Sequence, residues 1–377
     1  MTILLFTLIF VAFAVSWMVT LAMKHISPRI GFVDKPGHRK IHHNPKPLGG
    51  GVGIMAGFLL PVAAGLVIVW LMTPRSLPPD APAEFVERAQ TLNAYVGGAR
   101  EQTPLVLSIL GGALVLHLMG LRDDREALGP YAKLFIQLAV TTAIVVAFPD
   151  LRILTALGSV LAIVATVLWI TAITNAFNFL DNMDGLSAGV AAVCTTAFLV
   201  ATLSIQQWFV AAALALLLGA LLGFLCFNFS PATIFMGDAG SLVVGFLLGV
   251  LTVRTTFLPP GADFGAGWYA VVAPLIVLAV PLYDLVVVSI IRLRNGKSPF
   301  VGDTNHFSHR LVARGMSRRT AVLCIYLVTA ATSAAAIVLP HVRSGFLAAM
   351  IVGQTVLILG VVALLEQHPL PVPKEES

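Results

Sequence analysis

The chain has 377 residues, of which 58% are hydrophobic and only 11% are charged, and its formal net charge is +5. A soluble globular domain carries about 25% charged residues, so this composition excludes an ordinary soluble enzyme and favours a protein embedded in lipid. The three cysteines lie inside or beside apolar runs without metal-binding spacing, and we interpret them as packing residues: Cys194, Cys226 and Cys324.

Apolar runs recur from end to end, so we predict an all-α polytopic membrane protein. A spanning helix needs roughly 20 mainly apolar residues, and about eleven segments meet this criterion. They are 2–23, 51–72, 104–120, 131–149, 155–173, 187–205, 208–227, 241–258, 268–290, 320–339 and 345–365. The first run has no basic residue ahead of it and no clear cleavage site, which indicates a helix rather than a signal peptide. We expect one transmembrane transferase domain over 1–366 and a short cytoplasmic tail over 367–377.

The distribution of positive charge predicts the orientation. With the N-terminus outside, one set of loops shares a face: 24–50, 121–133, 174–186, 228–240, 291–319 and 366–377. These loops carry 17 of the 23 Lys and Arg residues, and positive loops stay in the cytoplasm. We therefore expect this face to be cytoplasmic. The largest loop on the other face, 73–103, predicts a short amphipathic helix from Ala83.

Polar clusters occupy the loops of the predicted cytoplasmic face, and the first runs from Asp34 to Gly51. It combines cations, prolines and three successive glycines, Gly49, Gly50 and Gly51. Anchoring at the inner membrane surface would explain the cations but not the glycines. We therefore predict a phosphate-facing loop.

The second cluster contains Asp123 and Asp124, followed by Lys133 at the start of the next apolar run. Paired carboxylates at a helix end can bind a divalent cation, or one of them can act as a base. The alternative is a solvated loop in which Arg122 and Arg125 neutralise both acids. This motif alone favours neither interpretation.

The third cluster, 174–186, contains Asn175, Asn178, Asp181 and Asp184. The two acids lie three residues apart and share one face if the segment is helical. Hard cations prefer such oxygen ligands. A capped helix start would explain one acid but not the whole set, so we favour a functional site.

The fourth cluster, 228–241, begins at Asn228 and places Asp238 between Gly237 and Gly240. Glycines let the backbone approach an anion or a metal, and the free amides of a helix start lie just beyond. An ordinary turn with a helix cap is the alternative. We predict Asp238 as the leading metal ligand.

The fifth cluster is a basic loop with Lys297, His306, His309 and Arg310. The histidines lie three residues apart and could face one site, while the two cations could pair with phosphates. A loop beside anionic lipid headgroups would also be basic. The two histidines favour a functional loop.

Together these groups suit phosphoryl chemistry, in which magnesium bridges phosphate oxygens and cations neutralise developing charge. The motifs occur in one order: Asp-x-Pro-x-x-Arg-Lys at 34–40, Asp123-Asp124, Asn-Ala-x-Asn-x-x-Asp-x-x-Asp-Gly-Leu at 175–186, Met-Gly-Asp-x-Gly-Ser at 236–241, and the His306/His309 loop. Over roughly residues 30–315 the chain resembles the polyprenyl-phosphate N-acetylhexosamine-1-phosphate transferase family. That family also contains the phospho-MurNAc-pentapeptide translocase.

The resemblance implies an activity. A UDP-N-acetylhexosamine, here UDP-GlcNAc, would donate its sugar-1-phosphate to undecaprenyl phosphate with release of UMP. The implied cofactor is Mg²⁺, with Mn²⁺ as a substitute, and the implied location is the bacterial inner (plasma) membrane. The product would begin a cell-envelope glycan such as lipopolysaccharide, O-antigen or teichoic acid. Membrane lipid and a second copy in a homodimer are the other expected partners, and we expect no nucleic acid.

The resemblance also implies roles for single residues. Asp238 resembles the magnesium ligand, and Asp123 resembles the acid proposed to deprotonate the lipid phosphate, with Asp124 assisting. Asp181 and Asp184 match acids on the nucleotide and metal side, so Asp181 is a second metal ligand. The other implied residues are His306 and His309 for catalysis and, for substrate binding, Lys133, Asn175, Asn178, Asn228, Lys297 and Arg310.

Two departures from the family pattern bear on the donor sugar. Asn182 stands where the pattern often has Gly, and Phe307-Ser308 interrupts what is often a denser histidine run. This loop resembles the simple N-acetylhexosamine branch more than the pentapeptide translocase, which stays as an alternative. A secondary transporter is the rival from another class, but its charges would be expected near the bilayer midplane, often with internal repeats.

Overall fold

The computed structural model describes residues 2–34, 45–73, 82–255, 272–299 and 303–366. The predictions for residues 35–44 of the first cluster and for the tail at 367–377 lie outside these described residues.

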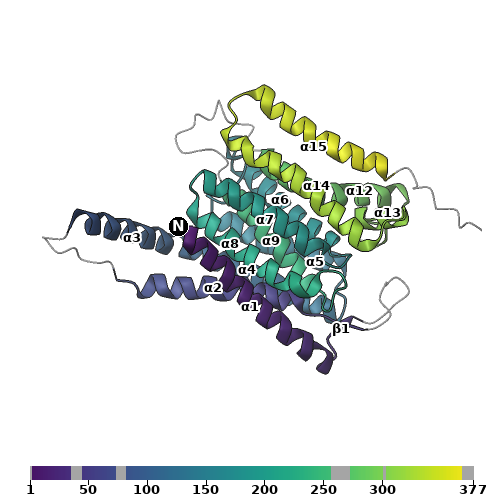
Figure 1. Ribbon diagram of the computed structural model, residues 1–377, viewed down its shortest axis with the longest axis horizontal. Helices are drawn as coiled ribbons and strands as arrows, with labels where there is room; N and C mark the ends of the chain where they lie inside the picture. The colour runs from purple at the N-terminus through teal and green to yellow at the C-terminus, as the bar shows by residue number, and fades with distance from the viewer. Residues whose placement is uncertain (1, 35–44, 74–81, 256–271, 300–302, 367–377) are drawn as a thin grey trace, which may run out of the picture.

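Helices make up almost all of the described chain (Figure 1). In chain order they are α1 (Thr2–Arg29), α2 (Gly50–Leu71), α3 (Ala83–Glu101), α4 (Thr103–Arg125), α5 (Pro130–Ala147), α6 (Ser159–Leu180), α7 (Leu186–Ser204), α8 (Trp208–Asn228), α9 (Asp238–Arg254), α11 (Ala273–Val277), α12 (Ala279–Arg294), α13 (Phe307–Ala313), α14 (Arg318–Val338) and α15 (Gly345–Leu365), with short 3-10 turns at Thr155–Leu157 and Leu339–His341. One antiparallel pair of two-residue strands, β1 (Val33–Asp34) and β2 (Lys46–Pro47), departs from the all-α prediction.

Each predicted apolar segment is mostly helical where the structure describes it. Nine of the described helices are long and apolar enough to cross a membrane, which makes the chain a multi-pass membrane protein. Two predicted spans differ from that pattern. Helix α9 has only 17 residues, and the segment predicted as one helix at 268–290 is divided between α11 and α12. Pro281 explains the division, because its ring clashes with the carbonyl four residues earlier, at Val277.

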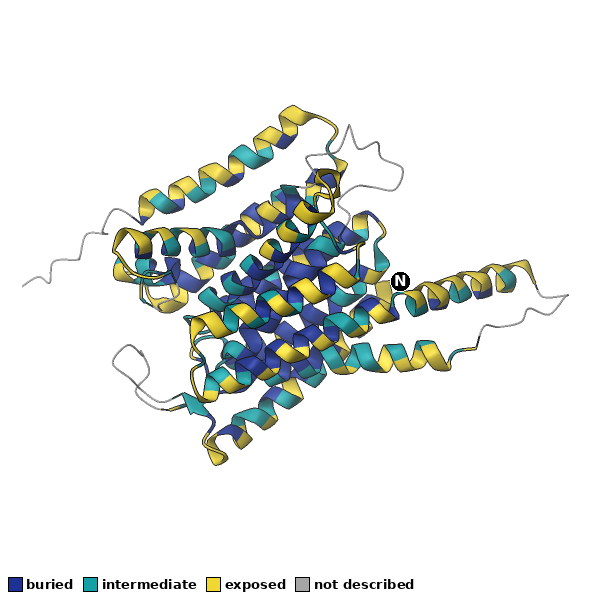
Figure 2. Cartoon of the chain, turned by 180° about the vertical axis from the view of Figure 1, so that it is seen from behind, coloured by how far each residue is buried: buried dark blue, intermediate teal, exposed yellow. Residues whose placement is uncertain are grey.

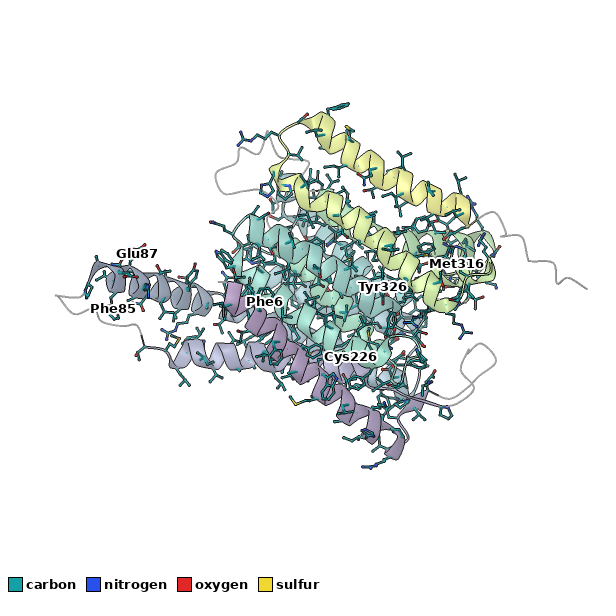
Figure 3. The ribbon with its side chains drawn as sticks, in the orientation of Figure 1. Phe6, Phe85, Glu87, Cys226, Met316 and Tyr326 are labelled. Atoms are coloured by element: carbon teal, nitrogen blue, oxygen red, sulfur yellow. The ribbon has the colours of Figure 1, made fainter. Side chains whose placement is uncertain are left out.

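Apart from α3, which continues into α4, successive long helices run in opposite directions, so alternate loops gather at the same end of the bundle (Figure 1). The end at the right of Figure 1, which we call the polar end, holds the described parts of these loops, at 30–34, 45–49, 126–129, 181–185, 229–237, 295–299, 303–306 and 314–317. These are the loops that positive charge assigned to one face. At the opposite end, the predicted short helix from Ala83 is the 19-residue α3, which projects from the bundle with the end of α2 and carries Phe85 and Glu87 (Figure 3).

The centre of the bundle is formed by α6, α7, α8 and α9, where buried residues gather (Figure 2). In the most apolar 18-residue stretch of α7, 78% of the residues are buried. The corresponding share in α15, which lies outermost beyond α14, is 17%. Large apolar side chains are exposed on the outer helices, as expected for a surface that faces lipid.

Pairs of glycines four residues apart hold the helices close together. An added methyl group at Gly219 of α8 would lie 2.2 Å from the carbonyl oxygen of Ile9, and one at Gly245 of α9 would lie 2.6 Å from the Cα of Thr174. In lipid, helix association depends on such close packing of small residues. The three pairs are Gly53 and Gly57 on α2 and Gly219 and Gly223 on α8, which both face α1, and Gly245 and Gly249 on α9, which faces α6.

Candidate functional site

An ammonium group bridges two carboxylates where α4, α5 and α9 meet at the polar end. The Nζ of Lys133 lies 3.0 Å from Oδ2 of Asp123 and 2.7 Å from Oδ2 of Asp238. All three side chains are mostly buried but open to solvent, with between 12% and 23% exposed. The structure therefore brings together the second and fourth polar clusters predicted from the sequence.

Asp124 binds the beginning of α9 from the neighbouring helix α4. Its Oδ1 accepts the backbone N–H of Asp238 at 2.8 Å, and its Oδ2 accepts that of Ala239 at 3.2 Å. These amides have no partner within α9, and a carboxylate there also interacts favourably with the helix dipole. Asp124 thus acts as an N-terminal cap for α9 and positions Asp238.

His117, Gly120 and Gly237 allow α4 to approach α9 closely. No motif in the sequence pointed to His117 or Gly120. The ring Nδ1–H of His117 donates to the carbonyl of Ala239 at 2.9 Å. A Cβ at Gly120 would lie 2.4 Å from the Cα of Ala239, and one at Gly237 would lie 2.4 Å from Oδ2 of Asp124. Gly237 also has φ +72°, which favours glycine.

The end of α6 supplies the amide groups of the site. Asn178 donates through Nδ2 to Oδ1 of Asp238 and to Oγ of Ser241, both at 2.9 Å. Asn175 lies nearly one turn earlier and donates to Oε1 of the buried Gln137 at 2.7 Å. Asn178 therefore contacts the acid cluster, whereas Asn175 is tied to α5.

Asp181 follows directly after α6 and faces the same acids. Burial raises the pKa of Asp181 well above its usual value, and the negative charges of Asp238 and Asp124 raise it further, against a hydrogen bond from the backbone of Gly237. Three carboxylates therefore repel one another across this site. A cation bound there would relieve that repulsion.

Asp184 and Asn228 form the framework behind these acids. Asp184 accepts the backbone N–H of Ala232 at 2.9 Å, while the Asn228 amide accepts from the N–H of Gly185 and donates to the carbonyl of Ile234, each at 3.0 Å. Residues 181–185 form a turn rather than a helix, so the predicted shared helical face of the two acids is wrong. The alternative of a side-chain cap is also wrong, because Gly185 is the N-cap of α7.

The glycines of the first cluster serve packing. The N–H groups of Gly50 and Gly51 donate to the carbonyls of Phe235 and Met236 at 2.9 and 3.0 Å. A Cβ at Gly51 would lie 2.3 Å from the backbone nitrogen of Gly240. These two glycines therefore hold α2 against the loop before Asp238, and this contact replaces the predicted phosphate-facing role for them.

The basic loop is anchored inside the protein. Asp284 accepts from Nδ1 of His306 at 2.8 Å, and Arg310 forms a two-pronged ion pair with Glu366, with Nη2 2.9 Å from Oε2. Sequence reasoning missed Glu366, because no spacing signal connects it to a residue 56 positions earlier. Lys297 is exposed at the turn after α12.

Two links join the basic loop to the end of α6. Arg292 lies over the ring of Phe179, 5.0 Å from its centroid, and Oγ of Ser308 donates to Oδ1 of Asn182 at 2.6 Å. Asn182 and Ser308 are the two departures from the family pattern, and they contact each other. Tyr326 belongs to α14 (Figure 3). Its hydroxyl donates to the carbonyl of Gly185 at 2.5 Å, which holds the same turn.

The metal prediction agrees with the donor chemistry. Asp238, Asp181 and Asn178 offer the oxygen ligands that Mg²⁺ prefers. In the arrangement of the described residues, no group of three or more His, Cys, Asp or Glu side chains is positioned to hold a metal ion, and Lys133 provides the positive charge between the acids. Magnesium binding remains a prediction.

Comparison with known proteins places these residues in a wider context. Residues 106–256 match the model of glycosyl transferase family 4. The chain is 33% identical over 343 residues to a probable undecaprenyl-phosphate N-acetylglucosaminyl 1-phosphate transferase of Bacillus subtilis, covering 88% of this chain and 85% of that protein.

Two further relatives have similar names. The chain is 31% identical to a decaprenyl-phosphate N-acetylglucosaminephosphotransferase of Mycolicibacterium smegmatis, over 84% of this chain and 76% of the relative. It is 28% identical to the undecaprenyl-phosphate alpha-N-acetylglucosaminyl 1-phosphate transferase of Escherichia coli K12, over 87% and 80%.

Proposed function

The chain belongs to the polyprenyl-phosphate N-acetylglucosaminyl-1-phosphate transferases of glycosyl transferase family 4, and from this premise we propose that it transfers GlcNAc-1-phosphate from UDP-GlcNAc to undecaprenyl phosphate. UMP is the second product. A new phosphoanhydride bond forms between an oxygen of the acceptor phosphate and the β-phosphorus of the donor. The bond between that phosphorus and the bridging oxygen breaks, and this oxygen leaves with UMP. The lipid-linked sugar then begins a cell-envelope glycan.

The observation that carries this proposal is the bridge from Asp123 through Lys133 to Asp238. Asp123 can accept a proton from the lipid phosphate, and Lys133 can neutralise charge that develops on the transferred phosphoryl group. These roles suit both a direct attack by the lipid phosphate and a route through an aspartyl intermediate.

Asp238 and Asp181, with the amide of Asn178, would hold Mg²⁺. When bound, such an ion would supply positive charge against the donor diphosphate. Asp124 keeps the first turn of α9 in place, so that Asp238 points at Asn178 and Lys133. Mn²⁺ should support the same reaction, since it also prefers oxygen ligands.

We place the polar end in the cytoplasm of a bacterium, with the protein in the plasma membrane. Part of the positive charge at the opposite end has a structural explanation, which supports this orientation. Arg100 donates to the carbonyls of Val69 and Met72 at the end of α2, and Arg152 donates to the carbonyls of Val145 and Val146 at the end of α5. Cations at helix C-termini are favourable because they bind the last free carbonyls and interact with the helix dipole. Arg100 and Arg152 therefore do not argue for a cytoplasmic location of that end.

The test is to incubate the purified protein with undecaprenyl phosphate, Mg²⁺ and one UDP-sugar at a time, and to measure UMP. We expect release with UDP-GlcNAc and loss of release when the metal is chelated. Release only with UDP-MurNAc-pentapeptide would overturn the donor assignment, and no release with any donor would favour the transporter. Asp238→Asn should abolish turnover while the protein still inserts, and unchanged activity would remove Asp238 from the metal site.

A further inference from the structure

The two histidines of the basic loop have different surroundings, and we infer that they have different roles. His306 is a positioning residue fixed inside the protein by Asp284 and Arg292, and His309 is the imidazole that contacts the sugar nucleotide. The inference rests on the proposed function, because it assigns one histidine of the basic loop to the protein framework and the other to contact with the sugar nucleotide.

His306 is enclosed by charged partners on both sides of its ring. Its side chain is 7% exposed, and that of Asp284 is fully buried. Oδ2 of Asp284 accepts from Nδ1 of His306 at 2.8 Å, and Oδ1 accepts the backbone N–H of Phe307 at 2.6 Å. On the opposite side, Nη2 of Arg292 lies 3.3 Å from Nε2.

These partners determine which ring nitrogen carries the proton. An ionised carboxylate only accepts hydrogen bonds, and a guanidinium only donates them. The proton of His306 is therefore on Nδ1, and the lone pair of Nε2 accepts from Arg292. Both ring nitrogens are satisfied within the protein, so neither remains to bind a substrate.

Arg292 also organises the loop that leads to His306. Its side chain is 2% exposed, and it donates to the carbonyl of Pro299 at 2.6 Å and to Oδ1 of Asp303 at 3.0 Å. Its guanidinium lies over Phe179 at the end of α6, and the same ring meets His306 edge-on, with centroids 5.6 Å apart. Arg292 and Asp284 thus fix the start of α13 against α6.

His309 lies on the same short helix with a different environment. Its side chain is part-exposed, its ring centroid lies 6.3 Å from that of His306, and no side chain among the described residues hydrogen-bonds to its ring. The next residue, Arg310, is held by Glu366. His309 is therefore the imidazole of this loop that is available to a ligand.

Substitutions should separate the two roles. His306→Ala should lower both the melting temperature and the activity, and His306→Asn should restore most of both, because an asparagine amide can still donate to Asp284. His309→Asn should raise the KM for UDP-GlcNAc about tenfold or more while the melting temperature stays unchanged. If His306→Asn is inactive at an unchanged melting temperature, His306 contacts substrate and the inference fails. If His309→Asn has the wild-type KM, the assignment of His309 fails.

A second measurement does not depend on activity. In ¹⁵N spectra of histidine-labelled protein, the signals absent from the His306→Asn variant should be those of a neutral ring protonated at Nδ1. A ring protonated at Nε2, or at both nitrogens, would overturn the positioning role. If no UDP-sugar yields UMP, the proposed function fails, and the spectra still decide how His306 is held.

Discussion

At the scale of single residues, Lys133 lies at the point where acids from two helices meet. Lys133→Met would leave Asp123 and Asp238 facing each other without a counter-charge. Because removing one electrostatic stabiliser typically costs about 10²–10³-fold in kcat, we expect a loss of this order in UMP release, with partial recovery in Lys133→Arg.

Arg122 provides the control for Lys133. It pairs with Glu126 on the surface, with 52% and 76% of the side chains exposed, and exposed ion pairs contribute little. Arg122→Met should therefore keep near wild-type turnover. Equal losses in Arg122→Met and Lys133→Met would mean that total positive charge matters, and not the bridge.

His309 predicts a pH dependence of stability. Burial lowers its pKa below the usual 6.5. Below pH 6.5 the unfolded chain binds a proton that the folded protein resists, so stability is lost as the pH falls from about 6.5 towards the folded pKa. Wild-type protein should therefore lose more melting temperature between pH 8 and pH 5.5 than His309→Gln. Parallel curves for the two proteins would contradict this expectation.

At the scale of helices, α2 offers a matched pair of glycines. A Cβ at Gly57 would lie 2.7 Å from Cβ of Ser16 and 2.9 Å from the carbonyl of Ala12, whereas Gly65 on the same helix has nothing within 4 Å. Gly57→Leu should therefore destabilise the protein by about 1–3 kcal/mol through overpacking. Gly65→Leu should be neutral.

Thermal unfolding in detergent measures this pair. A lower melting temperature for Gly57→Leu alone is the expected result. An equal decrease in melting temperature in both variants would show that leucine destabilises α2 at either position. Close packing of Gly57 against α1 would then not be the cause.

Most helices could be predicted from the sequence, because crossing lipid requires long apolar runs. The break at Leu278 could have been expected from Pro281, but an unbroken apolar run concealed it. The roles of Asp124 and His117 could not be predicted, because both depend on contact with residues more than a hundred positions later. The sequence indicated Asp123, Lys133 and Asp238 only as members of separate motifs. No spacing along the chain predicts that Lys133 lies between the two acids.

At the scale of the whole molecule, the proposed reaction requires all polar clusters on one side of the membrane. The alternation of helices places the loops near Glu126 and Lys297 at the polar end, and those near Thr155 and Arg343 at the opposite end. These four positions are exposed, so each can carry a single reporter cysteine.

The labelling experiment starts from a variant in which the native cysteines are replaced. Cysteines at Thr155 and Arg343 should react with an impermeant maleimide in intact cells, and those at Glu126 and Lys297 should react only after the membrane is opened. Reaction of all four from outside would mean that the loops do not alternate, and the reversed pattern would place the acid cluster on the outer face. A UDP-sugar made in the cytoplasm could not reach such a site, so this map decides whether the Asp123, Lys133 and Asp238 cluster can perform the proposed transfer.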